Sequence, residues 1–143
     1  MQRSAGFALL SMIISVLAGC GGKSDRVPIY PVRGKVVFAA PTPARAMVVF
    51  HPVGNSAPNI PRPFATLEKD GSFELSTYVS KDGAPEGEYV VTLTWELPAK
   101  GGDDDDSGPD LLRNTVYANP AKTPLKATIK PGRNELDAFL IKK

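Results

Sequence analysis

Beyond residue 30, apolar and polar residues alternate in short runs that are separated by turn-forming residues. In residues 88–97, for example, Tyr89, Val91, Leu93 and Trp95 alternate mostly with polar residues. A period of two is typical of a β-strand that buries one face. The pattern therefore predicts seven short strands, at 31–38, 45–51, 65–69, 72–78, 88–97, 125–130 and 134–141.

Turn-forming residues support this interpretation, since the chain contains 13 glycines and 14 prolines. Asp70-Gly71 predicts a type I′ hairpin turn, and Pro131-Gly132 suits the centre of a type II turn. No long helical stripe follows residue 25, and residues 109–116 are the candidate for one short helix. We therefore expect an all-β fold, a seven-stranded antiparallel sandwich.

The inward positions of these strands form the predicted core. In the last run, Leu136 and Leu140 are out of phase with Phe139 and Ile141, which predicts a β-bulge near Asp137. The predicted core residues are Val36, Phe38, Val48, Phe50, Phe73, Leu75, Tyr89, Val91, Leu93, Trp95, Leu125, Ile129 and Leu136.

The first 19 residues have the features of a signal-peptide helix. Arg3 precedes an uncharged apolar stretch, residues 7–17, which is too short to cross a hydrocarbon core of about 30 Å comfortably. Leu17-Ala18-Gly19-Cys20 follows and resembles the bacterial lipobox recognised by the lipoprotein signal peptidase. The resemblance implies cleavage before Cys20, a diacylglyceryl thioether on its sulfur and acylation of the new amino terminus. The alternative is an ordinary signal peptide, or a short membrane helix, with a chance cysteine.

The lipobox also implies a location. Two or three acyl chains hold a protein on a membrane without a spanning helix, and polar residues 20–30 are expected to form a flexible tether. An Asp after the cysteine would resemble the inner-membrane retention signal of enteric bacteria. Gly21 stands there instead, so we expect the outer membrane of a bacterial cell envelope, with the domain facing the periplasm or the outside.

Three stretches resemble carboxypeptidase regulatory-like domains when taken in order. They are Val-Arg-Gly-Lys-Val at 32–36, Asp-Gly-Ser-Phe-Glu-Leu at 70–75 and Pro-Glu-Gly-Glu-Tyr at 85–89, followed by Thr92. Tyr-Ala-Asn-Pro at 117–120 is similar to a segment of short bacterial lipoproteins built from one such domain.

The resemblance covers residues 31–141 and implies one domain at 31–143, a transthyretin-like (prealbumin-like) Greek-key β-sandwich. In such a fold the Tyr89 hydroxyl could bond back to the main chain near the Gly87 turn, as in a tyrosine corner. The alternative, which the residues favour, is that Tyr89 and Trp95 simply pack in the core. The family is known mainly as an accessory or structural module, so the resemblance supplies no catalytic residues and no cofactor.

Composition excludes several kinds of site. The single cysteine excludes an intrachain disulfide and cysteine-rich metal sites, and the single histidine, His51, excludes a zinc triad of histidines. The net charge of +2 is too small for a general nucleic-acid surface. The chain contains no Gly-x-Ser-x-Gly elbow, Walker loop or dinucleotide fingerprint. We therefore expect no catalysis and no nucleic-acid partner.

One acidic stretch gives a weak calcium candidate. Asp103, Asp105 and Ser107 alternate as at the start of a calcium loop. The twelfth position of that loop is Asn114 rather than a bidentate Glu, and the eighth is Asp110. These departures favour a solvated loop, so no metal is assigned.

Charge is unevenly distributed, because residues 111–143 contain 7 basic and 2 acidic residues. This excess could serve contact with anionic lipid or acidic glycans, or could be ordinary exposed lysine that discourages aggregation of strand edges. The residues concerned are Lys126, Lys130, Arg133, Lys142 and Lys143.

Together these features predict a lipid-anchored, non-enzymatic envelope module with a structural or protein-interaction role. Its partners would be the membrane, through the lipid, and an envelope protein or glycan. The alternative is a module that binds carbohydrate or another ligand. Fold analogy with starch-binding sandwiches makes Tyr30, Tyr78 and Tyr117 the candidate exposed aromatic residues for that role.

Overall fold

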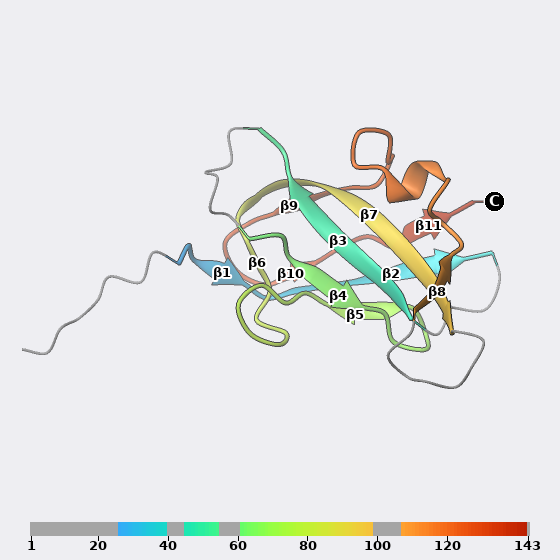
Figure 1. The fold of residues 1–143 in the computed structure, drawn as a ribbon. Coiled ribbons are helices and arrows are strands. Elements are labelled where there is room, and N and C mark those ends of the chain that lie inside the picture. The colour runs from blue at the N-terminus through green and yellow to red at the C-terminus, as the bar shows by residue number, and fades with distance from the viewer. Residues whose placement is uncertain (1–25, 40–44, 55–60, 99–106, 143) are drawn as a thin grey trace, which may run out of the picture.

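The computed structural model describes residues 26–39, 45–54, 61–98 and 107–142. Within these ranges the chain forms β-strands and one short 3₁₀ turn, η1 (Val116–Ala118), with no α-helix (Figure 1). The predicted all-β class is therefore confirmed. The signal-peptide helix expected at residues 1–19 lies outside the described residues.

One sheet is organised around the longest strand, β7 (Gly87–Pro98). All seven residues of strand β3 (Ala46–Pro52) pair antiparallel with β7, from Tyr89 to Trp95. Strand β4 (Phe64–Thr66) pairs with the other edge of β3. Two strands share the second edge of β7: β9 (Lys126–Ile129) pairs with its start and β8 (Ser107–Asp110) with its end.

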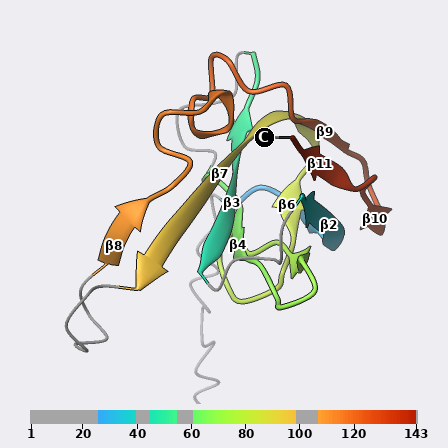
Figure 2. The same cartoon turned by 90° about the vertical axis from the view of Figure 1, so that its right-hand side faces the viewer.

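The opposing strands gather on β2 (Val32–Phe38). It pairs antiparallel with β5 (Ser72–Glu74), but parallel with β10 (Asn134–Glu135) and β11 (Phe139–Ile141). The expectation of a purely antiparallel sandwich is thus wrong for the last segment. Alternating burial looks the same in both orientations, so it could not reveal the direction. Figure 2 views these strands from the end of the molecule where the chain finishes.

The strands are more numerous than the seven predicted. Every predicted run overlaps at least one strand, and the last run is divided into two. Three further short strands were not anticipated because each pairs over only two to four residues and two of them contain proline. They are β8 and the pair formed by β1 (Ile29–Tyr30) and β6 (Ala84–Pro85).

The helix considered for residues 109–116 is not formed. The Asp110 carboxylate accepts hydrogen bonds from the main-chain N–H groups of Trp95 and Leu112, each at 2.9 Å. The first bond ties the segment to β7, and the second stabilises a turn. The side chain that could have capped a helix therefore fixes β8 and the turn after it.

The bulge predicted near Asp137 is confirmed by the register. Asn134 lies opposite Val32, whereas Phe139 lies opposite Val36. The last segment therefore contains one residue more than the facing part of β2. This extra residue lets Phe139 and Ile141 point into the core while Leu140 is 59% exposed.

The turn at Asp70-Gly71 is not type I′. The Glu68 carbonyl accepts from the Gly71 N–H at 2.9 Å, and the Glu68 N–H donates to the Ser72 carbonyl at 2.8 Å. Type I′ needs positive φ at both central residues, but Gly71 has a φ of 83° and Asp70 is not in that region. The loop therefore has three residues, 69–71, instead of the two of a type I′ hairpin, and Gly71 is in the bulge position.

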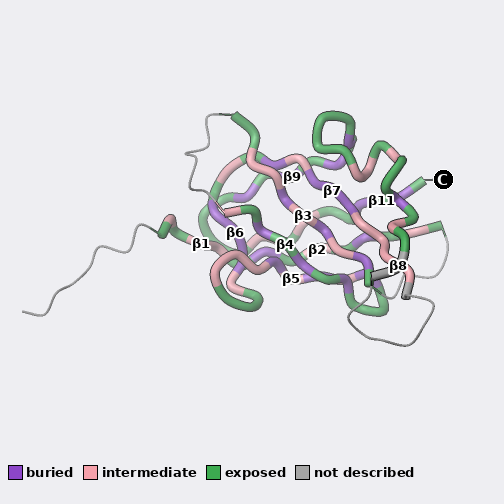
Figure 3. The backbone as a smooth tube through the Cα atoms, in the orientation of Figure 1, coloured by how far each residue is buried: buried purple, intermediate pink, exposed green. Residues whose placement is uncertain are grey.

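The core lies where the two sets of strands face each other, and buried residues alternate along them (Figure 3). All the predicted core residues are buried except Phe38, Trp95 and Leu136, which are partly buried and pack against it. Phe50 lies among rings from three other segments, those of Phe73, Tyr89 and Phe139.

Tyr89 is buried in the core and also makes the main-chain bond of a tyrosine corner, the less favoured of the two interpretations. Its hydroxyl donates to the Pro85 carbonyl at 2.9 Å, four residues earlier in the chain. Burial raises the pKa of Tyr89 to about 12. The hydroxyl therefore remains protonated and holds the β6–β7 corner closed over the whole physiological pH range.

We expect Gly83→Ala to destabilise the fold strongly. Gly83 has a φ of 106°, and a Cβ there would overlap the carbonyl oxygen of Tyr30 in β1. Gly132→Ala is the matched control, since its φ is 101° and nothing lies within 4 Å of the added carbon. Urea unfolding should show a loss of about 2–5 kcal/mol for the first variant and about 1–2 kcal/mol for the second. Equal losses would show that β1 does not constrain this position.

Candidate functional site

A pocket of about 520 Å³ opens at the end of the molecule where β2 and β11 finish. Its walls come from the two sets of strands and from the segment that follows β8. The lining is mainly apolar and includes Phe38, Trp95, Leu111, Leu112, Val116 and Ile141.

The pocket combines an aromatic pair with exposed aliphatic side chains. Phe38 from β2 and Trp95 from β7 meet edge to face, with ring centroids 5.8 Å apart. Leu111 and Val116, on the wall formed by the segment after β8, are 49% and 48% exposed. Concave apolar surface of this volume is typical of sites that bind an apolar or aromatic group.

Hydrogen bonds hold the segment that forms this wall. The Thr115 hydroxyl donates to the Leu112 carbonyl at 2.8 Å and accepts from the Tyr117 N–H at 3.3 Å. The Tyr117 hydroxyl accepts from the Lys142 N–H at 3.1 Å and reaches the carbonyl of the same residue at 3.4 Å. The wall is therefore fixed to the end of the C-terminal strand, and the pocket is preformed.

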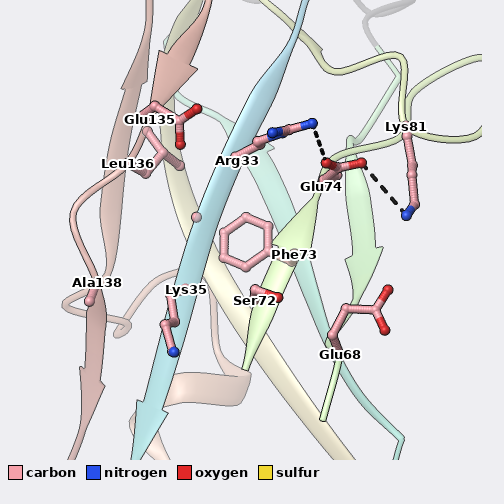
Figure 4. Close-up of a pocket in the computed structure, with 11 residues that line it drawn as sticks. Arg33, Lys35, Glu68, Ser72, Phe73, Glu74, Lys81, Glu135, Leu136 and Ala138 are labelled. Carbon is pink, nitrogen blue, oxygen red and sulfur yellow. Dashed lines mark ion pairs between the residues drawn. The ribbon is translucent and has the colours of Figure 1, made fainter. Parts of the chain in front are cut away.

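A second hollow, of about 440 Å³, lies over β2 and β5 and carries mixed charge (Figure 4). Glu74 lies between Arg33 at 2.7 Å and Lys81 at 3.6 Å. Exposed pairs of this kind contribute only about 0–1 kcal/mol each. Because the charges compensate each other, this surface favours neither an anionic nor a cationic ligand, and we regard it as the solvated face of the sheet.

The residues predicted for lipid attachment, Leu17, Ala18, Gly19 and Cys20, lie outside the described part of the chain. In the part that is described, no helix has the length and apolar character needed to cross a bilayer. Lipid attachment therefore remains a prediction from the sequence.

Most of the weak calcium candidate also falls outside the described ranges. Asp103 and Asp105 are not described, and Ser107 is the first residue of β8. Asp110, at the eighth loop position, is engaged with main-chain N–H groups. Among the described residues there is no group of three or more His, Cys, Asp or Glu side chains placed to hold a metal ion.

The three tyrosines proposed as exposed aromatic residues are partly buried, which corrects that expectation. Tyr117 bonds to the main chain of Lys142, and Tyr30 packs against the core. The Tyr78 hydroxyl accepts from the Val27 N–H at 3.2 Å. These side chains have structural partners because each lies where a chain end meets the sandwich.

The basic residues of the last third remain on the surface. Lys126, Lys130, Arg133 and Lys142 are all exposed, and Lys143 is not among the described residues. The Asn134 side chain bonds to both the N–H and the carbonyl of Lys130, at 2.9 Å each, and so fixes the turn that carries Arg133.

The only histidine has a local structural partner. His51 Nε2 lies 2.8 Å from the Thr92 hydroxyl on the neighbouring strand. Partial burial, and then the positive charge of Arg62, lower the pKa of His51 below its ordinary value of 6.5. The neutral imidazole is therefore the favoured form in the folded protein.

This shift predicts how stability depends on pH. Because the unfolded chain binds the proton more readily, the contribution of His51 is present above about pH 6.5 and is lost as the pH falls through the folded pKa. An NMR titration of the single imidazole should give a pKa below 6.5, and His51→Gln should flatten the pH dependence of unfolding between pH 7 and 5. A pKa at or above 6.5 would contradict the shift.

Trp95 is the only tryptophan, so its fluorescence reports on the apolar pocket. We expect 8-anilinonaphthalene-1-sulfonate to bind there and to quench Trp95 by energy transfer. Val116→Asp should weaken probe binding by about tenfold, because a carboxylate on the rim disfavours an apolar occupant. Val53→Asp is the control, since Val53 is equally exposed, at 49%, but does not line this pocket. Equal effects of the two substitutions would place the probe elsewhere.

Comparison with known proteins assigns no family to this chain. No family model, curated protein or solved structure matches it.

Proposed function

We propose that this protein is a lipid-anchored, non-enzymatic β-sandwich module of the bacterial cell envelope, with a structural or protein-interaction role. The observation that carries the proposal is the position of Cys20. It is the only cysteine, it directly follows an apolar run with small residues before it, and the described body begins six residues later, at Arg26. An acyl anchor there would hold the whole body close to a membrane.

We further propose that the body is a carboxypeptidase regulatory-like domain with transthyretin-like Greek-key topology. The motifs at 32–36, 70–75 and 85–89 support this assignment. The bond between the Tyr89 hydroxyl and the Pro85 carbonyl adds to it. The parallel pairing of β2 with β10 and β11 is the feature that any such assignment must accommodate.

A second candidate function, ligand binding, is favoured by the apolar pocket. The Phe38–Trp95 pair and the exposed Leu111 and Val116 would accept an apolar or aromatic group. The three tyrosines that are candidates for carbohydrate binding are partly buried and contact other parts of the protein. The alternative therefore shifts from sugar stacking toward an apolar ligand or an apolar side chain of an envelope protein.

Cell fractionation tests the lipid anchor. The unmodified sequence is expected to sediment with membranes, preferentially the outer membrane, and the mature protein should show the added mass of two or three acyl chains on a polypeptide that begins at Cys20. Cys20→Ala should remove both the acyl mass and the lipoprotein cleavage, while the control Ser24→Ala keeps them. A mature wild-type protein that begins elsewhere, or that lacks fatty acid, would refute the proposal.

A further inference from the structure

The segment that leads into the body is docked on it before the first long strand begins. The Arg26 guanidinium lies 4.9 Å from the centroid of the Tyr78 ring, and the Val27 N–H donates to the hydroxyl of the same ring. Ile29 and Tyr30 then pair with Pro85 and Ala84. The C-terminal part of the predicted tether is thus part of the folded body, and five residues separate Cys20 from Arg26.

This short connection limits how far the body can move from its anchor. Six Cα–Cα steps span at most about 20 Å when fully extended. Strand β7 alone, with 12 residues, is about 40 Å long. The body is therefore about twice as long as its link to Cys20. The end that carries the link must stay beside the anchor, while the other end can lie well away from it.

The end that carries the link also presents a loop, residues 77–82. The Asp82 carboxylate accepts hydrogen bonds from three successive N–H groups, those of Thr77 at 2.6 Å, Tyr78 at 2.9 Å and Val79 at 3.0 Å. The Lys81 N–H donates to the Ser76 hydroxyl at 2.8 Å. These bonds fix the loop in a shape that leaves Val79 62% exposed.

The chemistry of this loop suits the interface of a bilayer. Val79 is apolar and exposed, and Lys81 lies two residues further along the same loop. The Arg26 guanidinium lies over the ring of Tyr78, the residue before Val79. Apolar side chains enter the boundary between headgroups and acyl chains, and long cationic side chains reach the headgroup phosphates. Glu74, 3.6 Å from Lys81, and the Asp82 carboxylate within the loop compensate the positive charge, so this contact does not depend on anionic lipid.

We infer that loop 77–82 contacts the lipid bilayer through Val79 and that the apolar pocket points away from the membrane. Figure 1 shows the basis: β1 and the loop between β5 and β6 lie at one end of the body, and β8, η1 and the chain end lie at the other. The inference rests on the proposed function, because the link constrains the body only when Cys20 carries the lipid. In this orientation the apolar pocket is accessible to an envelope partner.

Single-site labelling tests this orientation. In the lipidated protein the Cys20 sulfur is blocked, so Val79→Cys supplies one free thiol for an NBD fluorophore. Leu140→Cys is the matched control, because Leu140 is 59% exposed and lies on β11, toward the far end. Each protein is reconstituted into phosphatidylcholine vesicles that contain doxyl-labelled lipid. An unchanged Trp95 emission spectrum confirms that the label leaves the fold intact.

We expect the fluorophore at position 79 to shift its emission to the blue and to be quenched about twofold or more relative to position 140. Equal quenching at the two positions, or stronger quenching at 140, would overturn the orientation. The mass of the same preparation separates the two proposals. Acylated Cys20 with an unquenched label at 79 refutes the orientation alone, whereas Cys20 without acyl chains refutes the lipid anchor and the orientation with it.

Discussion

The packing of Phe50 is the interaction on which the two-layered structure depends. Its ring lies 6.1 Å from Phe73, 5.9 Å from Tyr89 and 6.4 Å from Phe139, measured between centroids. These neighbours belong to β5, β7 and β11, so one side chain joins both sets of strands. Truncating a ring in such a position typically costs about 3–5 kcal/mol. The chain has no disulfide to replace that loss, since it contains a single cysteine.

Alternation along the chain predicted which side chains face this core, because a strand that buries one face must repeat every two residues. It could not predict what each strand pairs with or in which direction. The parallel position of the last segment against β2 depends on how the chain returns across the core. Strand β8 depends on the Asp110 carboxylate, which binds the Trp95 N–H far along the chain. Such long-range bonds leave no periodic signal.

Residues that meet only through long-range contacts also could not be recognised as a site from the sequence. The resemblance to a lipobox can be recognised because its residues are adjacent, Leu17 to Cys20. The apolar pocket is assembled from Phe38, Trp95 and residues 111–117, which no local motif connects. The alternation predicts Phe38 and Trp95 as core residues because they continue the inward faces of their strands. Both lie toward the ends of their strands and are only partly buried, which is the one local feature that relates to the pocket.

Docking the start of the body has an energetic reason. Ordering one residue costs about 1–2 kcal/mol of backbone entropy, so residues 26–30 become fixed only where contacts offset that loss. The β1–β6 pairing, the Arg26 contact and the bond from the Val27 N–H supply these contacts. Under the proposed lipid anchor, these contacts would limit the orientations of the body, because a body on a fully flexible tether samples every orientation. In the proposed lipid-anchored protein, a docked start would keep one end of the body toward Cys20, and the pocket at the other end would then face the space that a proposed partner could enter.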